Sequence, residues 1–264
     1  MAGSFPTGRF VWYECMVADV EAAKEFYLAV TGWSTDVWEG GEEPYTMWMN
    51  GEKAIGGLMK LPEDAAAAGV PPHWMGYVAT PDVEATVEKA RGLGAQVLVE
   101  VMDIPEVGRF AVLQDPQGAV FSAYTPSNDP PGQDAPPGEL DISWHELTTA
   151  DMDAGFKFYE ALFGWERKDS MDMGEAGLYQ MYGRPGEPLP LGGMYNKPPD
   201  MPAPPNWLYY IMVPDIDAAV ETVKAKGGQV LNGPMKVPGG DRVAQCMDPQ
   251  GAAFALHTLK KEGS

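Results

Sequence analysis

Asp115-Pro116-Gln117-Gly118-Ala119 occurs twice in this chain, the second time as Asp248-Pro249-Gln250-Gly251-Ala252. Outward from this stretch, further residues recur at a nearly constant offset of 132 to 136 positions. They are Asp19 and Asp151, Phe26-Tyr27 and Phe158-Tyr159, Gly32-Trp33 and Gly164-Trp165, Gly56-Gly57 and Gly192-Gly193, Trp74 and Trp207, Pro81-Asp82 and Pro214-Asp215, and Arg109 and Arg242. Self-similarity at one fixed offset indicates a duplicated unit. The chain is therefore predicted to contain two copies of one domain, so each site can be compared with its counterpart.

The composition limits the class of protein. The 264 residues, of which 45% are hydrophobic, suffice for two folded domains of ordinary size. The formal net charge of −20 disfavours nucleic acid and anionic membranes as partners. No apolar run reaches membrane-spanning length and no secretory signal is visible. We therefore expect a cytoplasmic protein, a monomer of two domains or a homodimer, whose partner is a small-molecule ligand.

A proline-rich segment separates the two copies. Residues 125–138 read TPSNDPPGQDAPPG and break every periodic pattern, as expected of a stiff, extended linker. We predict a first domain over residues 1–125, a linker over 126–139 and a second domain over 140–264.

Four helices are expected, each introduced by an aspartate. An aspartate in this position can accept hydrogen bonds from the free amides of the first helical turn. The predicted helices cover residues 20–30, 83–90, 152–163 and 216–225, after Asp19, Asp82, Asp151 and Asp215. Each follows a strand-like run and precedes short runs broken by Gly and Pro, such as residues 45–49 and 54–59. The repeating unit is thus predicted to be βαβββ, used four times.

These motifs resemble the vicinal-oxygen-chelate superfamily, which includes glyoxalase I, bleomycin-resistance proteins, fosfomycin-resistance enzymes and extradiol dioxygenases. The resemblance rests on the four βαβββ units, the Asp-to-Phe-Tyr helix entry, the Gly-Trp after it and the Asp-Pro-Gln-Gly-Ala turn. The tandem form is most similar to two-domain glyoxalase-like proteins of actinobacteria. The resemblance implies an α+β fold with two tandem glyoxalase/bleomycin-resistance-like domains, each a curved mixed sheet around a cup.

The resemblance also implies three metal-ligand positions per domain, where His, Gln or Glu would bind a divalent metal. These positions hold Trp12, Met75 and Ser122 in the first copy and Trp144, Leu208 and Ala255 in the second. None of the six is a usual ligand, so we predict no metal site and no other cofactor. Should a metal bind, His145, Glu146 and His257 are the first residues to consider.

Strand alternation places a carboxylate near each of the two tryptophans that occupy implied metal-ligand positions. Glu14 follows Trp12 by two residues and Glu146 follows Trp144 by two, so each pair shares one face of a strand. The functional interpretation is that Glu14 and Glu146 are catalytic acid/base groups whose pKa values are raised by apolar surroundings. The alternative is that each carboxylate accepts hydrogen bonds from backbone amides or a tyrosine and holds its strand in place.

A mainly aromatic set is predicted to contact the ligand, with core packing as the alternative. It comprises Trp12, Trp144, Tyr45, Tyr179, Trp74, Trp207, Ser122 and His257. His257 replaces Tyr124 of the first copy, and the small Ala255 replaces Ser122. We therefore expect the second copy to be the ligand-binding one, with an affinity that varies around neutral pH.

The remaining reactive side chains have two interpretations each. Arg109 and Arg242 either pair with nearby acids or anchor an anionic substrate. Cys15 and Cys246 correspond to leucines in the other copy, which favours buried apolar thiols over a disulfide or a nucleophile. No Ser/His/Asp pattern is visible in the sequence.

Two classes of function stay open. One is a glyoxalase-like lyase or isomerase, or a hydroxylase-type enzyme, that acts on a small, partly apolar metabolite without the usual metal ligands and with a glutamate as acid/base. The other is a non-catalytic protein that sequesters a small molecule, as drug-resistance members of the resembled superfamily do. A metal-dependent lyase or dioxygenase is a third alternative.

Overall fold

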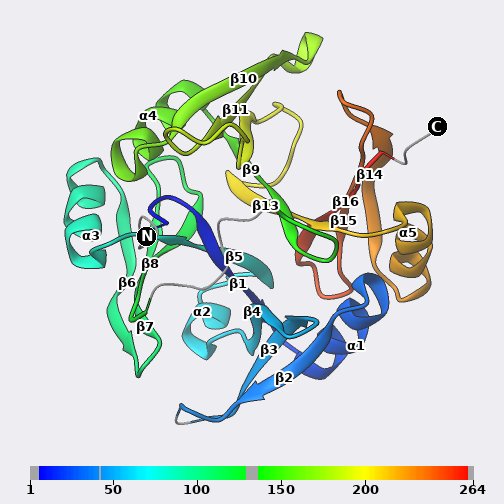
Figure 1. The fold of residues 1–264 in the computed structure, drawn as a ribbon, viewed down its shortest axis with the longest axis horizontal. Coiled ribbons are helices and arrows are strands. Elements are labelled where there is room, and N and C mark those ends of the chain that lie inside the picture. Colours follow the sequence, from blue (N-terminus) through cyan, green and yellow to red (C-terminus); the bar gives the residue numbers. More distant parts are fainter. Residues whose placement is uncertain (1–5, 42, 129–135, 261–264) are drawn as a thin grey trace. The chain divides into compact units, whose positions relative to one another are not determined.

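The structure is a computed structural model that describes residues 6–41, 43–128 and 136–260 (Figure 1). The described residues form two eight-stranded mixed sheets with few helices, in two tandem copies of one α+β domain, as predicted. The first sheet contains β1 (Phe10–Val17), β2 (Ser34–Trp38), β3 (Tyr45–Asn50), β4 (Lys53–Lys60), β5 (His73–Ala79), β6 (Gln96–Ile104), β7 (Gly108–Gln114) and β8 (Val120–Pro126). The second contains β9 (Ile142–Thr149), β10 (Glu166–Asp172), β11 (Leu178–Gly183), β12 (Gly192–Asn196), β13 (Asn206–Met212), β14 (Gln229–Lys236), β15 (Arg242–Met247) and β16 (Ala253–Thr258).

The two sheets have the same strand order, which reflects the duplication. The first runs β2-β3-β4-β1-β5-β8-β7-β6, and the second runs β10-β11-β12-β9-β13-β16-β15-β14. In each sheet the first strand of a βαβββ unit pairs in parallel with the last strand of the same unit, as β9 does with β12 and β13 with β16. The other pairings within a unit are antiparallel hairpins. This arrangement repeats four times, as predicted.

The predicted aspartate caps are confirmed. The helices are α1 (Val20–Thr31), α3 (Val83–Gly92), α4 (Met152–Phe163) and α5 (Ile216–Ala225). The side chains of Asp19, Asp82, Asp151 and Asp215 accept hydrogen bonds from amides of the first turns. Gly32 and Gly164 end α1 and α4 in the left-handed conformation, which glycine adopts without a steric penalty. A short helix, α2 (Glu63–Ala67), and a one-turn 3-10 helix, η1 (Gly174–Ala176), were not expected.

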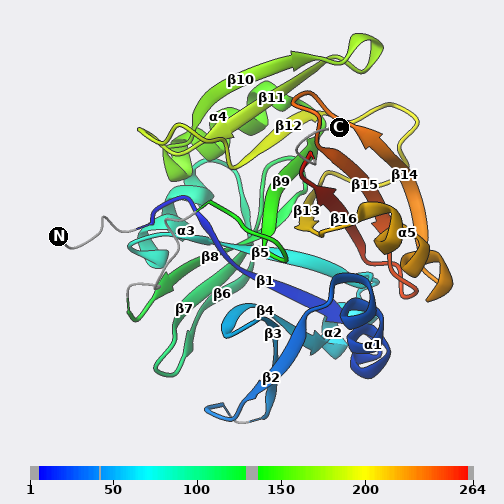
Figure 2. The same cartoon turned by 45° about the vertical axis from the view of Figure 1, so that its right-hand side comes forward.

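The described chain packs into two compact units, and each unit combines parts of both copies. The first unit contains residues up to 12, 75–128 and 144–207, and the second contains 13–74, 136–143 and 208–260. Figures 1 and 2 show α3 beside β6–β8 in the first unit and α5 beside β14–β16 in the second. The domain boundaries predicted from the sequence stay predictions. Residues 129–135 of the predicted linker lie outside the described residues, and Pro126 still belongs to β8.

The repeated Asp-Pro-Gln-Gly-Ala turn explains how the copies interlock inside each unit. In the first unit, Gln117 accepts a hydrogen bond from the Asp151 amide at 2.5 Å and donates one to the Asp151 carbonyl at 2.8 Å. Asp115 accepts from three amides of its own turn through Oδ1 and from the Tyr159 hydroxyl at 3.0 Å through Oδ2. The turn of the first copy therefore holds the start of α4, a helix of the second copy.

The second unit contains the reciprocal arrangement. Gln250 binds the backbone of Asp19 through its amide oxygen and nitrogen, at 2.8 and 2.7 Å. Asp248 accepts from the Tyr27 hydroxyl at 3.1 Å. Burial raises the pKa of Asp115 and of Asp248 above the usual value for aspartate, although the backbone amides of the turn favour the ionised form. The motifs that revealed the duplication are thus the residues that join one copy to the other.

Each unit has an aromatic core around the tyrosine of this contact. In the first unit, Tyr159 lies against Phe121, Trp165 and Trp207, with ring centroids 5.2 to 5.4 Å apart. In the second, Tyr27 lies against Trp48, Trp74 and Phe254, with centroids 5.2 to 5.7 Å apart. The Tyr159–Trp165 pair is stacked and the other five are edge-to-face, and aromatic contacts of both kinds add to the stabilisation from burial. Among the described residues, none of the helices has the length and apolar character needed to cross a membrane.

Replacing Tyr159 by phenylalanine is expected to lower the free energy of unfolding by about 1–3 kcal/mol, because the buried Asp115 carboxylate loses a donor and the Trp207 indole loses its acceptor. Tyr27→Phe should cost a similar amount, since Tyr27 has the same two partners in the second unit. Urea denaturation measures both changes. Tyr124→Phe is the control, because the Tyr124 hydroxyl donates to an exposed carbonyl of Val107 and should contribute less. Equal losses for all three variants would contradict the role assigned to the interlocking contact.

Candidate functional site

The second copy holds a buried carboxylate within a group of aromatic side chains. Glu146 lies on β9 and is only 6% exposed, and its Oε2 accepts a hydrogen bond from the Tyr179 hydroxyl of β11 at 2.9 Å. The same hydroxyl accepts a hydrogen bond from the Trp144 indole nitrogen at 2.7 Å. Trp144, Tyr179 and Glu146 thus form one connected polar group on neighbouring strands. The structure brings these three predicted site residues together.

Glycine at one position of β12 allows this contact. Gly193 is paired with Glu146 in the sheet, and a Cβ atom there would overlap the Tyr179 ring. Without a side chain at Gly193, the tyrosine can cross β12 and reach the carboxylate. The preceding Gly192 has a different role, because a Cβ atom there would overlap the backbone carbonyl of His145. The repeated glycine pair therefore permits close strand approach at its first residue and tyrosine placement at its second.

The first copy has the corresponding glutamate–tyrosine pair. Glu14 on β1 is 4% exposed and accepts a hydrogen bond from the Tyr45 hydroxyl at 2.5 Å. Gly57 pairs with Glu14, and a Cβ atom there would overlap the Tyr45 hydroxyl. The two glutamate–tyrosine pairs agree with the interpretation in which each carboxylate accepts a hydrogen bond from a tyrosine.

One aromatic neighbour distinguishes the two groups. Tyr195 on β12 stacks on Tyr179 at a centroid distance of 5.8 Å, and its counterpart at an offset of 136 is Met59. Burial raises the pKa of Tyr195, and the negative charge of Glu146 raises it further. The phenol therefore stays protonated at neutral pH, and the carboxylate of the second copy lies among three aromatic side chains.

Comparison with known proteins agrees with this architecture. Residues 141–256 match the Glyoxalase/Bleomycin resistance protein/Dioxygenase superfamily, and residues 12–124 match a glyoxalase-like domain. CFP32 of Mycobacterium tuberculosis strain CDC 1551, a glyoxylase by name, is 34% identical over 249 residues, which cover 93% of this chain and 92% of CFP32. The anthracycline biosynthesis protein DnrV of Streptomyces peucetius is 28% identical over 268 residues, 97% of this chain and 95% of DnrV.

This chain belongs to the glyoxalase/bleomycin resistance protein/dioxygenase superfamily.

Two solved structures share the fold at low identity. The Mn(II)-bound glyoxalase from Novosphingobium aromaticivorans superposes with a TM-score of 0.62 at 18% identity, over 97% of this chain and 83% of that one. The 2,3-dioxygenase LapB from Pseudomonas sp. KL28 gives a TM-score of 0.65 at 11% identity, over 97% of this chain and 94% of that one. These likenesses concern the fold alone.

The residues at the superfamily's metal positions do not fit a metal. The six positions hold indole, thioether, hydroxyl and alkyl side chains, which are not the imidazole and carboxylate ligands that divalent metals take in proteins. Ser122 is fully buried and its hydroxyl donates to the Ala111 carbonyl at 3.0 Å. Within the described residues, no three His, Cys, Asp or Glu side chains gather closely enough to hold a metal ion. The donor set therefore argues against the metal chemistry of other superfamily members, and the predicted lack of a metal stays a prediction.

Other predicted ligand-contact residues lie elsewhere. Trp74 and Trp207 are 7% and 6% exposed, and their indole nitrogens donate to the hydroxyls of Tyr27 and Tyr159 at 2.8 and 3.1 Å. They are placed in the two aromatic cores and not beside a glutamate. Trp12 is half-buried on β1. Contact of these residues with a ligand stays a prediction.

His257 takes part in a hydrogen-bonded line that sequence reasoning missed. Its Nδ1 lies 2.8 Å from the Ser143 hydroxyl, and its Nε2 lies 3.2 Å from Asp241 Oδ2. A protonated Nε2 would donate to Asp241, leaving Nδ1 to accept from Ser143. The Ser143 hydroxyl also donates to the Tyr210 carbonyl at 3.2 Å, so in this tautomer its single hydrogen would be shared between two acceptors. The signals in the sequence are that Ser143, Asp241 and His257 replace Val11, Gly108 and Tyr124 of the first copy.

The structure shows the ion pairs of the two arginines and the state of the two cysteines. Arg109 pairs with Glu84 and Asp103, and Arg242 pairs with Asp217, so pairing with local acids is confirmed. Cys15 and Cys246 are buried free thiols, also as predicted. Burial raises the pKa of the Cys246 thiol to about 12 and that of Cys15 well above its ordinary value. Neither thiol is therefore an activated nucleophile at neutral pH.

Proposed function

We propose that the second copy binds a small, partly apolar metabolite beside Trp144, Glu146 and Tyr179, and that Glu146 removes a proton next to a carbonyl or hydroxyl group of that ligand. The single observation behind this proposal is the buried Glu146 carboxylate, held at 2.9 Å by Tyr179 within aromatic surroundings. Such surroundings favour an apolar ligand, and a positioned carboxylate is a common general base. Tyr179, which donates to the carboxylate, orients it and can donate to the ligand when the proton moves.

The relatives support this ligand class. CFP32 is named as a glyoxylase, and DnrV is named for anthracycline biosynthesis. A carbonyl substrate in the first case and an aromatic one in the second would both match a carboxylate among aromatic side chains. By this comparison we propose an enzyme of lyase, isomerase or hydroxylase type that does not depend on the superfamily's metal positions. Glu14 would have the equivalent role in the first copy, where Met59 takes the place of Tyr195.

The alternative is a protein that sequesters the ligand without changing it. The observation in its favour is that the Tyr179 hydroxyl already engages the carboxylate and the Trp144 indole, an arrangement that also suits a fixed binding wall. A metal-dependent lyase or dioxygenase is favoured less, because its ligand positions hold Trp144, Leu208 and Ala255 in this copy.

A ligand screen by thermal shift, with carbonyl-containing and aromatic metabolites, separates these alternatives. For each compound that raises the melting temperature, turnover and dissociation constant are then measured. Glu146→Gln is expected to keep the dissociation constant within about threefold and to reduce turnover by about a hundredfold, as expected for loss of a general base. A sequestering protein would show saturable binding and no turnover with every compound that binds.

Comparing the two glutamates identifies the working copy. Glu146→Ala is expected to weaken binding of these compounds at least tenfold, because it removes the carboxylate and releases Tyr179. Glu14→Ala removes the matching residue of the first copy and should change binding less than twofold. If Glu14→Ala abolishes binding while Glu146→Ala leaves it intact, the site belongs to the first copy and the assignment made here is wrong.

A further inference from the structure

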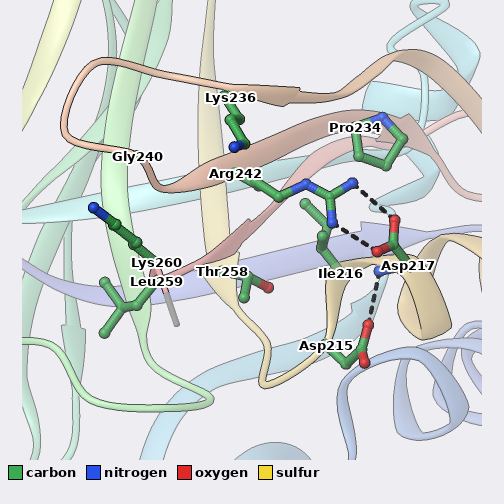
Figure 3. Close-up of a pocket in the computed structure, with 10 residues that line it drawn as sticks. All are labelled: Asp215, Ile216, Asp217, Pro234, Lys236, Gly240, Arg242, Thr258, Leu259 and Lys260. Carbon is green, nitrogen blue, oxygen red and sulfur yellow. Dashed lines mark hydrogen bonds and ion pairs between the residues drawn. The ribbon is translucent and has the colours of Figure 1, made fainter. Parts of the chain in front are cut away.

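A separate pocket lies in the second unit, between the start of α5 and the β14–β15 hairpin (Figure 3). Its volume is about 590 Å³. It is lined by Asp215, Ile216, Asp217, Pro234, Lys236, Gly240, Arg242, Thr258, Leu259 and Lys260. None of the residues of the proposed catalytic group lines it. A ligand in this pocket would therefore be independent of the proposed function.

The pocket concentrates positive charge in an acidic protein. The chain has 18 Lys and Arg residues against 38 Asp and Glu, and three of the basic residues line this pocket: Lys236, Arg242 and Lys260. Both acids of the pocket are already engaged. Asp215 accepts from the first amides of α5, and Asp217 forms two hydrogen bonds with the Arg242 guanidinium, at 2.6 and 2.8 Å.

The two lysines make no ion pair with any residue that the structure describes. Figure 3 shows the Lys236 ammonium beside Arg242, while the Lys260 ammonium points away from both. The stem of Lys260 runs across Gly240, where a Cβ atom would lie 2.8 Å from the lysine Cδ. The pocket therefore has a positive wall formed by Lys236 and Arg242, with Lys260 at its rim on a flexible stem.

The corresponding position in the first copy has the opposite charge. At a constant offset of 133, Asp215, Asp217, Lys236, Arg242 and Lys260 correspond to Asp82, Glu84, Asp103, Arg109 and Ser127. The formal charge is +1 for the five residues of the second copy and −2 for their counterparts.

A single exchange accounts for most of this difference. Lys236 faces Arg242 across the β14–β15 ladder, just as Asp103 faces Arg109 across β6–β7. In the first copy Arg109 lies between two carboxylates, those of Glu84 and Asp103, and is neutralised. In the second copy Lys236 removes one of these carboxylates and adds a cation. A lysine beside an arginine is electrostatically unfavourable unless an anion lies between them.

We propose that the pocket of the second copy is a binding site for a small organic anion, a carboxylate or a phosphate ester. The Lys236 ammonium and the part of the Arg242 guanidinium not engaged by Asp217 would bind its oxygens, and Lys260 would swing in to complete the charge. Arginine offers a planar set of donors that suits oxyanions, and lysine adds a point charge. The apolar Ile216, Pro234 and Leu259 would contact the carbon skeleton of the ligand.

The test is a titration of the full chain with inorganic phosphate and, separately, with acetate, at low ionic strength. Binding is followed through the Arg242 side-chain and Lys236 backbone signals in NMR spectra. We expect saturable binding with a dissociation constant below about 10 mM for at least one of the two anions. The tighter-binding anion identifies the ligand as a phosphate ester or a carboxylate.

Lys236→Asp recreates the charge pattern of the first copy and is expected to weaken this binding at least tenfold. Lys226 is also exposed and lies just after α5, so Lys226→Asp makes the same change in net charge outside the pocket and should alter binding less than twofold. Thermal melting verifies that both variants are folded. Equal binding by the wild type and both variants, or no saturable binding by the wild type, would overturn the proposal.

Discussion

Gly192→Ala is expected to lower the free energy of unfolding by about 3 kcal/mol or more, the largest loss expected for any single change considered for this chain. Gly192 lies in β12, which pairs in parallel with β9, and its partner in the ladder is His145. A Cβ atom at Gly192 would overlap the His145 carbonyl, which is backbone and cannot rotate away. The two strands would have to separate, and the ladder that carries Glu146 on β9 would be disturbed.

The loss should be visible as a lower urea midpoint, with binding of any identified ligand reduced in parallel. Gly92→Ala is the matched control. Gly92 is the last residue of α3, where a Cβ atom meets no atom within 4 Å, and alanine favours the helix by up to about 1 kcal/mol. If Gly192→Ala is as stable as Gly92→Ala, then β9 and β12 are farther apart than the structure has them.

Much of the fold could be predicted from local patterns. The aspartate caps and helical periodicity predict both ends of α4 and α5 as observed, and the ends of α1 and α3 to within two residues. This is possible because capping and amphipathic spacing depend on residues within one turn of helix. The sequence shows that the glycine pairs are repeated but does not explain them. Their reason lies in partners distant in sequence, the His145 carbonyl for Gly192 and the Tyr179 ring for Gly193.

The pairing of the two copies could not be predicted from either copy alone. Gln117 binds Asp151, the N-cap of α4, and Asp115 binds Tyr159 within α4; both partners lie more than 30 positions away. The recurrence of aspartate at positions 115 and 248 indicates a duplication. It does not reveal that each of these aspartates contacts the other copy. The site has the same limitation. Strand alternation paired Trp144 with Glu146 on one face, and only the three-dimensional packing brought Tyr179 between them.

The contribution of His145 to the free energy of unfolding is expected to fall by about 2.5 kcal/mol between pH 7 and pH 4.5. His145 is buried, stacks on Phe10 with ring centroids 4.1 Å apart, and its Nδ1 lies 2.7 Å from the Leu191 carbonyl. A carbonyl only accepts, so Nδ1 carries the proton and donates. Burial lowers the pKa of His145 from the ordinary 6.5 to about 4, because the interior disfavours the charged ring.

The direction of the effect follows from the two pKa values. Between pH 6.5 and pH 4 the unfolded chain binds a proton at His145 and the folded chain does not. Protonation therefore stabilises the unfolded state, and the stability contributed by the neutral ring is complete above pH 6.5 and lost as the pH falls towards 4. His73, whose pKa burial also lowers, acts in the same direction, while the raised pKa of Asp115 and of Asp248 acts in the opposite one.

The His145 contribution is isolated by comparing urea denaturation of the wild type and of His145→Asn at pH 7 and pH 4.5. The asparagine amide can donate to the Leu191 carbonyl in place of Nδ1 but does not titrate, so the variant keeps every other pH-dependent group. The variant is expected to be less stable than the wild type at pH 7, because it loses the contact with Phe10, and to lose about 2.5 kcal/mol less on acidification. The position of His145 between Phe10 and the Leu191 carbonyl disfavours protonation in the folded chain. Equal losses of stability in the two proteins would contradict this, because they would mean that His145 takes up its proton as readily in the folded chain as in the unfolded one.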